Sequence, residues 1–514
     1  MTEDQVLASA VSKMILRSEK ENDSQKLILS FVDAGILEQI DNFNNQIIYG
    51  RRGTGKTHIL KYFSSSLKED PKNIPLYIDS RNLGSTSSFS DVSNSLQFRC
   101  LHLFQDILEL ISDALLNHLT DTTCDEKQFM LLQQFNDIIT LTLKKINPTT
   151  FKQKTENSSQ TNYGLEYPLK AHLSFADNDS VSNELEGVIN SPESITFPEV
   201  NKTIRDFLNE DKSILFILID EWSSIPHDLQ PYLAEFLKRS FMTESNIVIK
   251  IATLEYRSNF NLRTDKDIIG FEFGGDVSIA LEIDDFYVYD RNPENISNLF
   301  SQILYKHITS ELPENYLVKT YNIEDYISLC SKLFTNKDVF NELIRAAEGV
   351  IRDFINIFRD AFFDAKQRKS EKIDKLSIVN SAQNWYERDK LSNLDSDMNK
   401  VLTRIVEDVI GNKKARSFML QNSFGKNDML MKLFDARVIH IMKQGYSDKD
   451  HPGLRYNVYS LDYGTYVALK NTKSNPQTSF TEIDEPKEGL IIPFDDKRSI
   501  RRIILNIDIL NPSR

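Results

Sequence analysis

One stretch, "QIIYGRRGTGKTHILKYF" from Gln46 to Phe63, constrains the fold of this 514-residue chain more than any other part of it. It joins a β-branched run (Ile47, Ile48), a glycine-rich loop and a segment whose apolar residues recur at helical spacing. The pattern Gly-x-x-x-x-Gly-Lys-[Ser/Thr] requires this order of strand, loop and helix in order to cradle phosphate groups. The sequence therefore predicts an α/β fold in which a parallel sheet carries a phosphate-binding loop, the P-loop.

Each residue type in this loop has a physical reason to be there. Glycines let successive backbone N–H groups curl around a phosphate, and the following helix points its positive dipole end at the same anion. Lys56 adds a mobile charge that reaches the outer phosphates, and the Thr57 hydroxyl suits a magnesium ion. The predicted ligand is a nucleoside triphosphate. The residues expected to bind it are Gly50, Arg51, Arg52, Gly53, Thr54, Gly55, Lys56, Thr57 and His58.

The segment "SILFILIDEWSSIP", Ser213 to Pro226, contains the second informative feature. Its unbroken apolar run is typical of a central parallel strand, and ligands bind beyond the carboxyl ends of such strands. Asp220 is therefore predicted to hold the magnesium ion through water, and Glu221 to act as general base toward an attacking water. We expect Glu221 and Lys56 to be the catalytic pair, in one crevice with Asp220.

Composition excludes several classes of protein. The net charge of −14 disfavours nonspecific binding to nucleic acid or acidic membranes over the whole surface. The three cysteines lie far apart, so neither a disulfide framework nor a zinc ribbon is indicated. The apolar run "ILFILI" is far shorter than the ~20 residues of a membrane-spanning helix, and the amino terminus has no signal-peptide core. A cytoplasmic protein without a membrane partner is expected.

Three domains are predicted. Residues 1–290 form the nucleotide-binding domain, with an insertion at about 98–195 that is helical in period up to residue 147 and then polar. Residues 291–390 form a helical lid that starts with Asn292 as cap and Pro293 in the first turn. Residues 391–514 read as helices followed by a hairpin, a winged-helix-like domain with a β-rich tail. A helix is also expected over residues 25–44, and a strand over residues 456–469.

These residues resemble the AAA+ ATPases of the origin-recognition and replication-initiator clade, including related bacterial ATPases. The motifs are "GRRGTGKT", "LIDEW" and, in the lid, "EGVIRDFINIFRDAF", and the resemblance covers about residues 25 to 365. It implies ATP and Mg²⁺ as ligands and Arg352 as the sensor 2 arginine. It places sensor 1 in "ATLEYR", with Thr253 and Glu255 as rival candidates, and an arginine finger at Arg257 or Arg263. From the residues alone, Arg352 also fits a solvated helix face, and the polar residues after residue 252 also fit ordinary loop positions.

Two functions remain open at this level. The first is an ATP-hydrolysing AAA+ switch that controls assembly on DNA or with partner proteins. The second is a STAND-like signalling or anti-phage defence ATPase that forms a homo-oligomer and recruits an effector without reading DNA. Basic residues only slightly outnumber acidic ones between residues 395 and 470, so DNA contact and protein contact by the C-terminal domain are both consistent with the sequence. A GTPase is disfavoured, because "TNKDV" places Asp338 one residue too early for the guanine motif.

Overall fold

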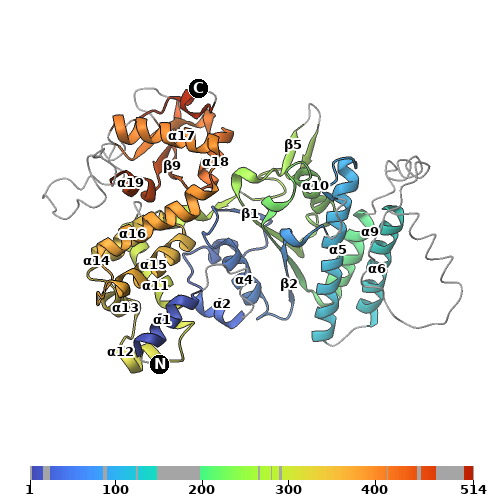
Figure 1. The fold of residues 1–514 in the computed structure, drawn as a ribbon. Helices are drawn as coiled ribbons and strands as arrows, with labels where there is room; N and C mark the ends of the chain where they lie inside the picture. Colours follow the sequence, from blue (N-terminus) through green and yellow to red (C-terminus); the bar gives the residue numbers. More distant parts are fainter. Residues whose placement is uncertain are drawn as a thin grey trace. The chain divides into compact units, whose positions relative to one another are not determined.

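The structure is a computed structural model that describes residues 3–14, 24–84, 89–122, 126–146, 197–263, 267–278, 280–288, 292–413, 415–425, 427–447, 453–470 and 503–512. The chain forms two compact units, whose elements are labelled in Figure 1. The sheet unit comprises Leu37–Tyr49 and Leu60–Leu281, and the loop–lid unit comprises Met1–Ile36, Gly50–Ile59 and Glu282–Arg514. The predicted division into three domains at residues 290 and 390 stays a prediction.

The sheet unit is built on a five-stranded sheet with the strand order β2-β3-β4-β1-β7. Strands β1, β2, β3 and β4 pair in parallel, which confirms the predicted α/β fold with a parallel sheet. Tyr49, the last residue of β1, pairs with Thr253, the last residue of β4, so these strands end at one edge of the sheet. The strands are β1 Gln46–Tyr49, β2 Asn73–Asp79, β3 Ile214–Asp220, β4 Ile247–Thr253 and β7 Leu281–Glu282, with a separate antiparallel pair of β5 Asn261–Arg263 and β6 Ile268–Gly270.

Strands β3 and β4 form the centre of this sheet. Every residue of β3 from Leu215 to Asp220 is buried, and so is all of β4. A parallel strand covered on both faces must be apolar throughout, which explains the unbroken run in the sequence. The exception is Lys250 in β4, whose Nζ donates to the Asn44 carbonyl at 2.9 Å and to the Gln46 Oε1 at 2.5 Å, just before and at the start of β1. Burial lowers the pKa of Lys250 to about 7.

The helices of the sheet unit bury the apolar faces that their sequences predicted. The stripe of α5 that includes Leu101, Phe104 and Ile107 is buried, and the His118 Nε2 near its end donates to the Asp211 Oδ2 at the end of α9 at 2.8 Å. The two helices predicted between residues 98 and 147 are present as α5 and α6, while the polar part of the predicted insertion lies mostly outside the described residues and its status as an insertion stays a prediction. These helices are α3 Leu37–Ile40, α5 Leu96–Asp121, α6 Glu126–Ile146, α9 Phe197–Asp211 and α10 Gln230–Phe241. In the described part of the chain no helix is long and apolar enough to cross a membrane.

The lid helices begin as predicted at Asn292, whose side chain caps α11 by accepting from the Asn295 N–H. The helix predicted over residues 25–44 is wrong, because α2 ends at Ser30. There the Asp33 carboxylate accepts the Ile36 N–H at 2.9 Å and Gly35 has φ +86°, which turns the chain. Before the C-terminal segment, the helices of the loop–lid unit are α1 Glu3–Lys13, α2 Ser24–Ser30, α11 Pro293–Thr309, α12 Tyr316–Tyr321, α13 Tyr326–Leu333, α14 Lys337–Ala347, α15 Ile351–Gln367 and α16 Lys375–Trp385, and α4 Lys56–Leu67 begins in this unit and ends in the sheet unit.

The C-terminal segment contains the predicted succession of helix, strand, helix and hairpin. Its three strands form an antiparallel sheet of order β8-β10-β9. The strand predicted to run to Leu469 ends at Leu461, because Asp462 Oδ1 accepts the Gly464 N–H at 2.9 Å and opens a helix. The elements are α17 Ser396–Val406, β8 Ser417–Gln421, α18 Asp428–Asp435, β9 Ile439–Ser447, β10 Arg455–Leu461 and α19 Tyr463–Lys470. The winged-helix assignment itself stays a prediction.

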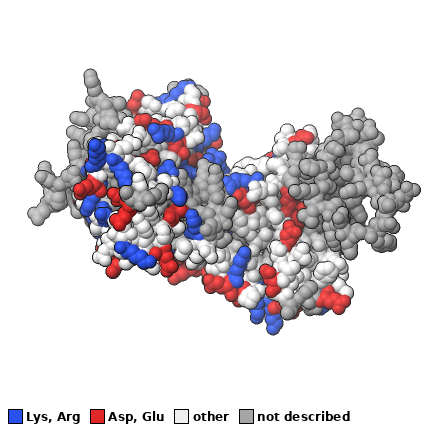
Figure 2. All heavy atoms as spheres, turned by 60° about the horizontal axis from the view of Figure 1, so that its bottom comes forward, with Lys and Arg blue, Asp and Glu red and all other residues white. Residues whose placement is uncertain are grey.

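The tail contributes little to this sheet among the described residues. Met419 in β8 donates its N–H to the Ile503 carbonyl at 2.7 Å and accepts the Leu505 N–H at 3.0 Å. The first predicted tail strand, "GLIIPFDD", lies outside the described residues. On the face drawn in Figure 2, blue basic and red acidic side chains of the described residues are interspersed and do not form a continuous basic strip.

Candidate nucleotide site

The P-loop is organised around a buried lysine. The Lys56 Nζ donates to the Gly50 carbonyl at 2.7 Å and to the Arg51 carbonyl at 2.9 Å, which holds the ammonium group inside the loop at the start of α4. Gly53 and Gly55 have φ values of +88° and +96°, a backbone region that favours glycine. The ammonium group, the helix dipole and the loop N–H groups therefore give this loop the electrostatics of an anion site.

The lid meets the P-loop at Gly53. The Arg352 N–H, in the uncapped first turn of α15, donates to the Gly53 carbonyl at 3.0 Å. A Cβ added at Gly53 would lie 2.8 Å from the Arg352 Cβ and 3.1 Å from the Val350 Cγ1. The structure therefore places the predicted sensor 2 arginine at the P-loop, while its contact with a nucleotide stays a prediction.

Replacing Gly53 by alanine should disturb this junction. The new methyl group meets Arg352, and the alanine that carries it must adopt a strained positive φ. We therefore expect a loss of roughly 1 to 3 kcal/mol in stability together with weaker ATP binding. Thermal unfolding and calorimetric titration with ATP measure the two effects. Gly35→Ala is the matched control, because Gly35 has φ +86° and nothing within 4 Å of an added Cβ. An equal loss of stability and of ATP affinity in both variants would show that the effect comes from the positive φ alone.

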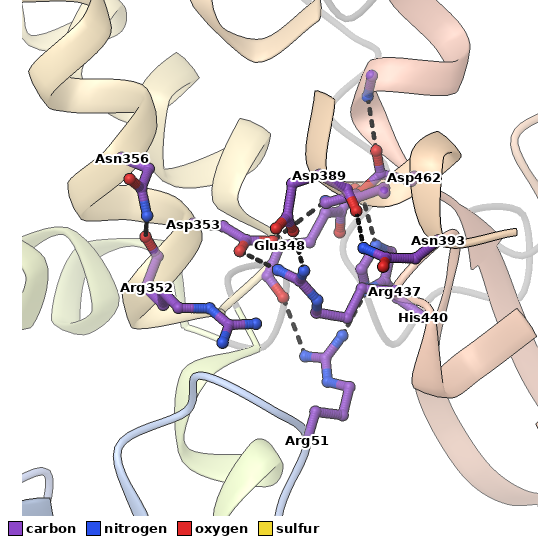
Figure 3. Close-up of polar contacts among 12 residues, drawn as sticks. Arg51, Glu348, Arg352, Asp353, Asn356, Asp389, Asn393, Arg437, His440 and Asp462 are labelled. Carbon is purple, nitrogen blue, oxygen red and sulfur yellow. Dashed lines mark hydrogen bonds and ion pairs between the residues drawn. The ribbon is translucent and has the colours of Figure 1, made fainter. Parts of the chain in front are cut away.

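Arg51 carries its guanidinium group away from the loop interior, toward the lid and the C-terminal segment (Figure 3). Its Nη2 donates to the Glu348 carbonyl at 3.0 Å, its Nη1 contacts the His440 Nδ1, and its Nε lies 3.4 Å from Asp284. The group also lies over the Phe434 ring, 5.7 Å from its centre. Sequence reasoning missed Asp284 and His440, because neither belongs to a local pattern.

The remaining loop residues differ in exposure. Thr54 is fully buried, and its Oγ1 donates to the Arg51 carbonyl at 2.9 Å, which stabilises the turn of the loop. Arg52 is exposed. The His58 Nε2 lies 2.8 Å from the Leu27 carbonyl, so that ring nitrogen carries the proton and donates. His58 is thus used to attach α4 to the end of α2.

Within the sheet unit, Asp220 is fully buried and held by two donors at the end of β3. The Tyr77 hydroxyl donates to its Oδ2 at 2.9 Å and the Glu221 N–H to its Oδ1 at 2.9 Å. Burial and the Asp220 carboxylate raise the pKa of Tyr77, so the phenol stays protonated and donates. Tyr77 thus orients the predicted magnesium ligand, a role that the sequence pattern did not reveal.

Glu221 follows in a left-handed conformation with φ 54° and ψ 38°. This region is costly for a residue with a side chain, and such strain is typical of functional sites. The next residue, Trp222, is fully buried and stacks on Phe260 with ring centres 5.3 Å apart, which holds the turn in place. Asp79 pairs with Asp220 in register at the same edge, but its carboxylate is engaged by Arg81 at 2.5 Å.

The sensor 1 candidates lie at the end of β4. The Thr253 side chain is buried, and its hydroxyl lies 2.5 Å from the Ser258 hydroxyl. Glu255 begins a short 3-10 helix and is half-buried. The arginine finger candidates, Arg257 in that helix and Arg263 at the end of β5, are both exposed, as an arginine that acts on a neighbouring subunit must be.

The residues predicted to hold magnesium fit that ion chemically. Mg²⁺ prefers hard oxygen ligands, and one carboxylate, one hydroxyl, water and phosphate oxygens make up a usual set. Asp220 carries the carboxylate, whose oxygens accept from the Tyr77 hydroxyl and the Glu221 N–H. Thr57, in the first turn of α4, carries the hydroxyl named in the prediction. Among the described residues there is no group of three or more His, Cys, Asp or Glu side chains that suggests a different metal site.

Solved structures similar to this one include Cdc6p from Pyrobaculum aerophilum, with 12% identity, coverage of 88% of this chain and 93% of that chain, and a TM-score of 0.33. The Aeropyrum pernix ORC1 protein in complex with DNA gives 14% identity, 91% and 97% coverage, and a TM-score of 0.32. The Thermotoga maritima RuvB Holliday junction branch migration motor gives 11% identity, 76% and 76% coverage, and a TM-score of 0.30.

No curated protein matches the chain. The ORC-CDC6-like family model matches residues 17–325, which is more than half of the chain and contains the P-loop, Asp220, Glu221 and the start of the lid. The resemblance predicted from the motifs is therefore confirmed, and this protein belongs to the ORC-CDC6-like family.

Proposed function

We propose that this protein is an ATP-binding and ATP-hydrolysing AAA+ switch whose nucleotide state controls its assembly on DNA or with partner proteins. The observation that carries the proposal is the P-loop, with the Lys56 ammonium group buried inside it and the lid backbone at Arg352 hydrogen-bonded to Gly53. Membership in the ORC-CDC6-like family supports it. Lys56 and the loop N–H groups bind the phosphates, and Arg352 senses the outer phosphate from the lid.

Hydrolysis is assigned to the acidic pair after β3. Asp220 is held in one orientation by Tyr77, and together with Thr57 it would hold Mg²⁺, which supplies positive charge to the phosphate oxygens. Glu221 accepts the proton of the attacking water. Thr253 or Glu255 serves as sensor 1, and Arg257 or Arg263 acts on the nucleotide of a neighbouring copy in a homo-oligomer.

The contacts of the P-loop explain how the nucleotide could act as a switch. The loop touches the lid at Gly53 and the C-terminal segment at His440, through Arg51. A displacement of the loop when the γ-phosphate leaves would therefore act on both parts at once. The three predicted domains, with a winged-helix-like domain at the C-terminal end, give this switch a part that moves and a part that meets the partner.

One feature of the C-terminal segment favours a protein partner over DNA. In a winged helix α18 would be the recognition helix, and its first turn borders a groove of about 550 Å³. Four aspartates, Asp395, Asp397, Asp428 and Asp508, line this groove beside Lys432. Carboxylates at this position repel the DNA backbone, whose affinity comes from basic side chains. This observation supports, as second candidate, a signalling or defence ATPase that assembles without reading DNA.

Two measurements test the proposal. We expect the particle mass in solution to increase when ATP and magnesium are added to the wild-type protein, because the arginine finger needs a neighbouring copy. An unchanged mass would contradict nucleotide-controlled self-assembly. DNA binding is then measured over a range of salt concentrations. Affinity that falls steeply with salt supports assembly on DNA, and no affinity even at low salt leaves assembly with a protein partner.

A further inference from the structure

The Arg51 side chain of the P-loop ends in a contact with the C-terminal segment. Its guanidinium group is buried and contacts the Nδ1 of His440, which lies in β9 of the C-terminal segment, far from the P-loop in sequence. The cavity beside this contact measures about 30 Å³, which is room for one or two water molecules and not for a nucleotide. Arg51 therefore serves this contact with the C-terminal segment.

The proton positions on His440 follow from its two neighbours. A guanidinium group has only donors, so the Nδ1 that faces Arg51 must accept. The Nε2 then carries the proton and donates to the Asp462 Oδ2 at 2.9 Å. The ring is neutral, and burial lowers the pKa of His440 to about 3. A protonated His440 would instead point an N–H group at the Arg51 cation.

Asp462 continues into a buried ion network, drawn in Figure 3. Lys390 Nζ lies 2.5 Å from Asp462 and 3.2 Å from Asp353, and Arg437 bridges Asp353 and Asp389. Although burial acts to raise the pKa of Asp353, Lys390 and Arg437 hold it below its ordinary value. Charges of opposite sign alternate along the network, so the removal of one leaves a buried neighbour without compensation.

The network returns to the P-loop at its other end. Asp353 follows Arg352 directly in α15, and the Arg352 N–H donates to the Gly53 carbonyl. The P-loop is thus attached at two points, through Arg51 to His440 and through Gly53 to the residue before Asp353. The first attachment leads to β9 and the second to α15, and the buried ion network that includes Asp462, Lys390 and Asp353 connects these two elements.

We propose that His440 is a positioning residue for the P-loop: by holding Arg51 it preorganises the loop for nucleotide and couples nucleotide affinity to the packing of the C-terminal segment Ser396–Lys470. The inference rests on the proposed function, because it assumes that the loop binds nucleotide. Preorganisation lowers the ordering cost of binding. Coupling is reciprocal, so bound nucleotide must stabilise the C-terminal segment by the same factor.

His440→Leu removes both hydrogen bonds of the ring and should weaken ADP binding by roughly 10- to 100-fold, within the usual range of coupling between sites. His440→Gln keeps one acceptor and one donor and should restore most of the affinity. Calorimetric titration with ADP and magnesium measures both. Val458→Ala is the control, because Val458 is buried in the C-terminal sheet in a hydrophobic cluster with Met419 and Tyr456. It should lower the stability of that sheet and leave the affinity unchanged.

The reciprocal effect is measured by hydrogen exchange. In the wild-type protein, ADP should slow amide exchange in β9 and β10, and in His440→Leu this protection should be lost. A histidine that only stabilises its own sheet would lower protection equally with and without ADP. That result, or equal ADP affinity in wild type, His440→Gln and His440→Leu, would overturn the inference and leave the proposed function standing.

The coupling should also weaken in acid. A released histidine titrates near ~6.5, and the charged groups that face His440 are Arg51, Asp462 and Lys390. The pKa of His440 is lower in the packed form than in the released form, so the packed form is fully favoured above about pH 6.5. Below that pH the equilibrium constant that favours the packed form falls by up to roughly tenfold per pH unit. The difference in ADP affinity between wild type and His440→Leu should therefore shrink from pH 7 to about pH 5. A difference that does not change with pH would contradict the proposed role of the neutral ring. Absence of ADP binding by the wild type at every pH would overturn the proposed function and this inference together.

Discussion

Replacing Lys56 by alanine should abolish ATP binding. The Lys56 ammonium group lies inside the P-loop, 2.7 Å and 2.9 Å from the carbonyl oxygens of Gly50 and Arg51, where the phosphates are expected. Its removal takes away a charge-assisted hydrogen bond to phosphate and also the hydrogen bonds that the lysine donates to the Gly50 and Arg51 carbonyls inside the loop. The first effect alone is of the order of 1.5 to 3 kcal/mol, and with the second we expect at least ~100-fold weaker binding by calorimetric titration.

Lys68→Ala provides the control for charge. Lys68 is exposed just beyond the end of α4, so its loss changes the net charge of the protein equally and should leave ATP affinity as it is. The unfolding temperature of Lys56→Ala shows whether the loop still folds. A folded Lys56→Ala protein that binds ATP as the wild type does would refute the assignment of this loop as the nucleotide site.

The P-loop was predictable because its requirements are local. Two glycines with φ near +90° and a lysine at the start of a helix follow from a short pattern, and β3 was recognisable because a strand buried on both faces has to be apolar. The assignment of Arg352 as the sensor 2 arginine came instead from the resemblance of the lid helix to that of the family, and it stays a prediction. Such features depend on neighbours in sequence, which is why the sequence was sufficient for them.

The partners of these residues could not be predicted in this way. Tyr77 reaches Asp220 only because β2 pairs with β3, and Asp284 and His440 reach Arg51 only through the tertiary fold. Lys250 looks like an interruption of an apolar strand, yet it is buried and hydrogen-bonded to the segment before β1. No period or motif marks such positions, since each depends on pairing between elements far apart in the chain.

The two incorrect secondary-structure predictions share one cause. Apolar periodicity favoured a helix over residues 25–44 and a strand over residues 456–469, but an aspartate side chain captured a backbone N–H in each segment. Asp33 binds the Ile36 N–H and turns the chain, and Asp462 binds the Gly464 N–H and begins α19. Side-chain capture of the backbone competes with regular structure, and a single aspartate is a weak signal beside a long apolar pattern.

Glu221→Gln should keep ATP binding and lose hydrolysis. Glutamine has nearly the same shape, so the left-handed turn with φ 54° is preserved, but its amide cannot accept the proton of an attacking water. General-base catalysis typically contributes about 10²- to 10⁴-fold, and we expect the rate of phosphate release to fall by that factor. Single-turnover phosphate release measures the rate, and calorimetric titration with ATP measures binding.

Glu199→Gln is the matched control for the loss of a carboxylate, because Glu199 is exposed in the first turn of α9 and should not affect turnover. If Glu221→Gln turns over ATP at the wild-type rate, another group accepts the proton. If it fails to bind ATP, Glu221 supports the structure of the site instead. Only bound and unhydrolysed ATP agrees with a general base, and a variant in that state would also hold the protein in its ATP form, in which the mass of the assembled switch can be measured.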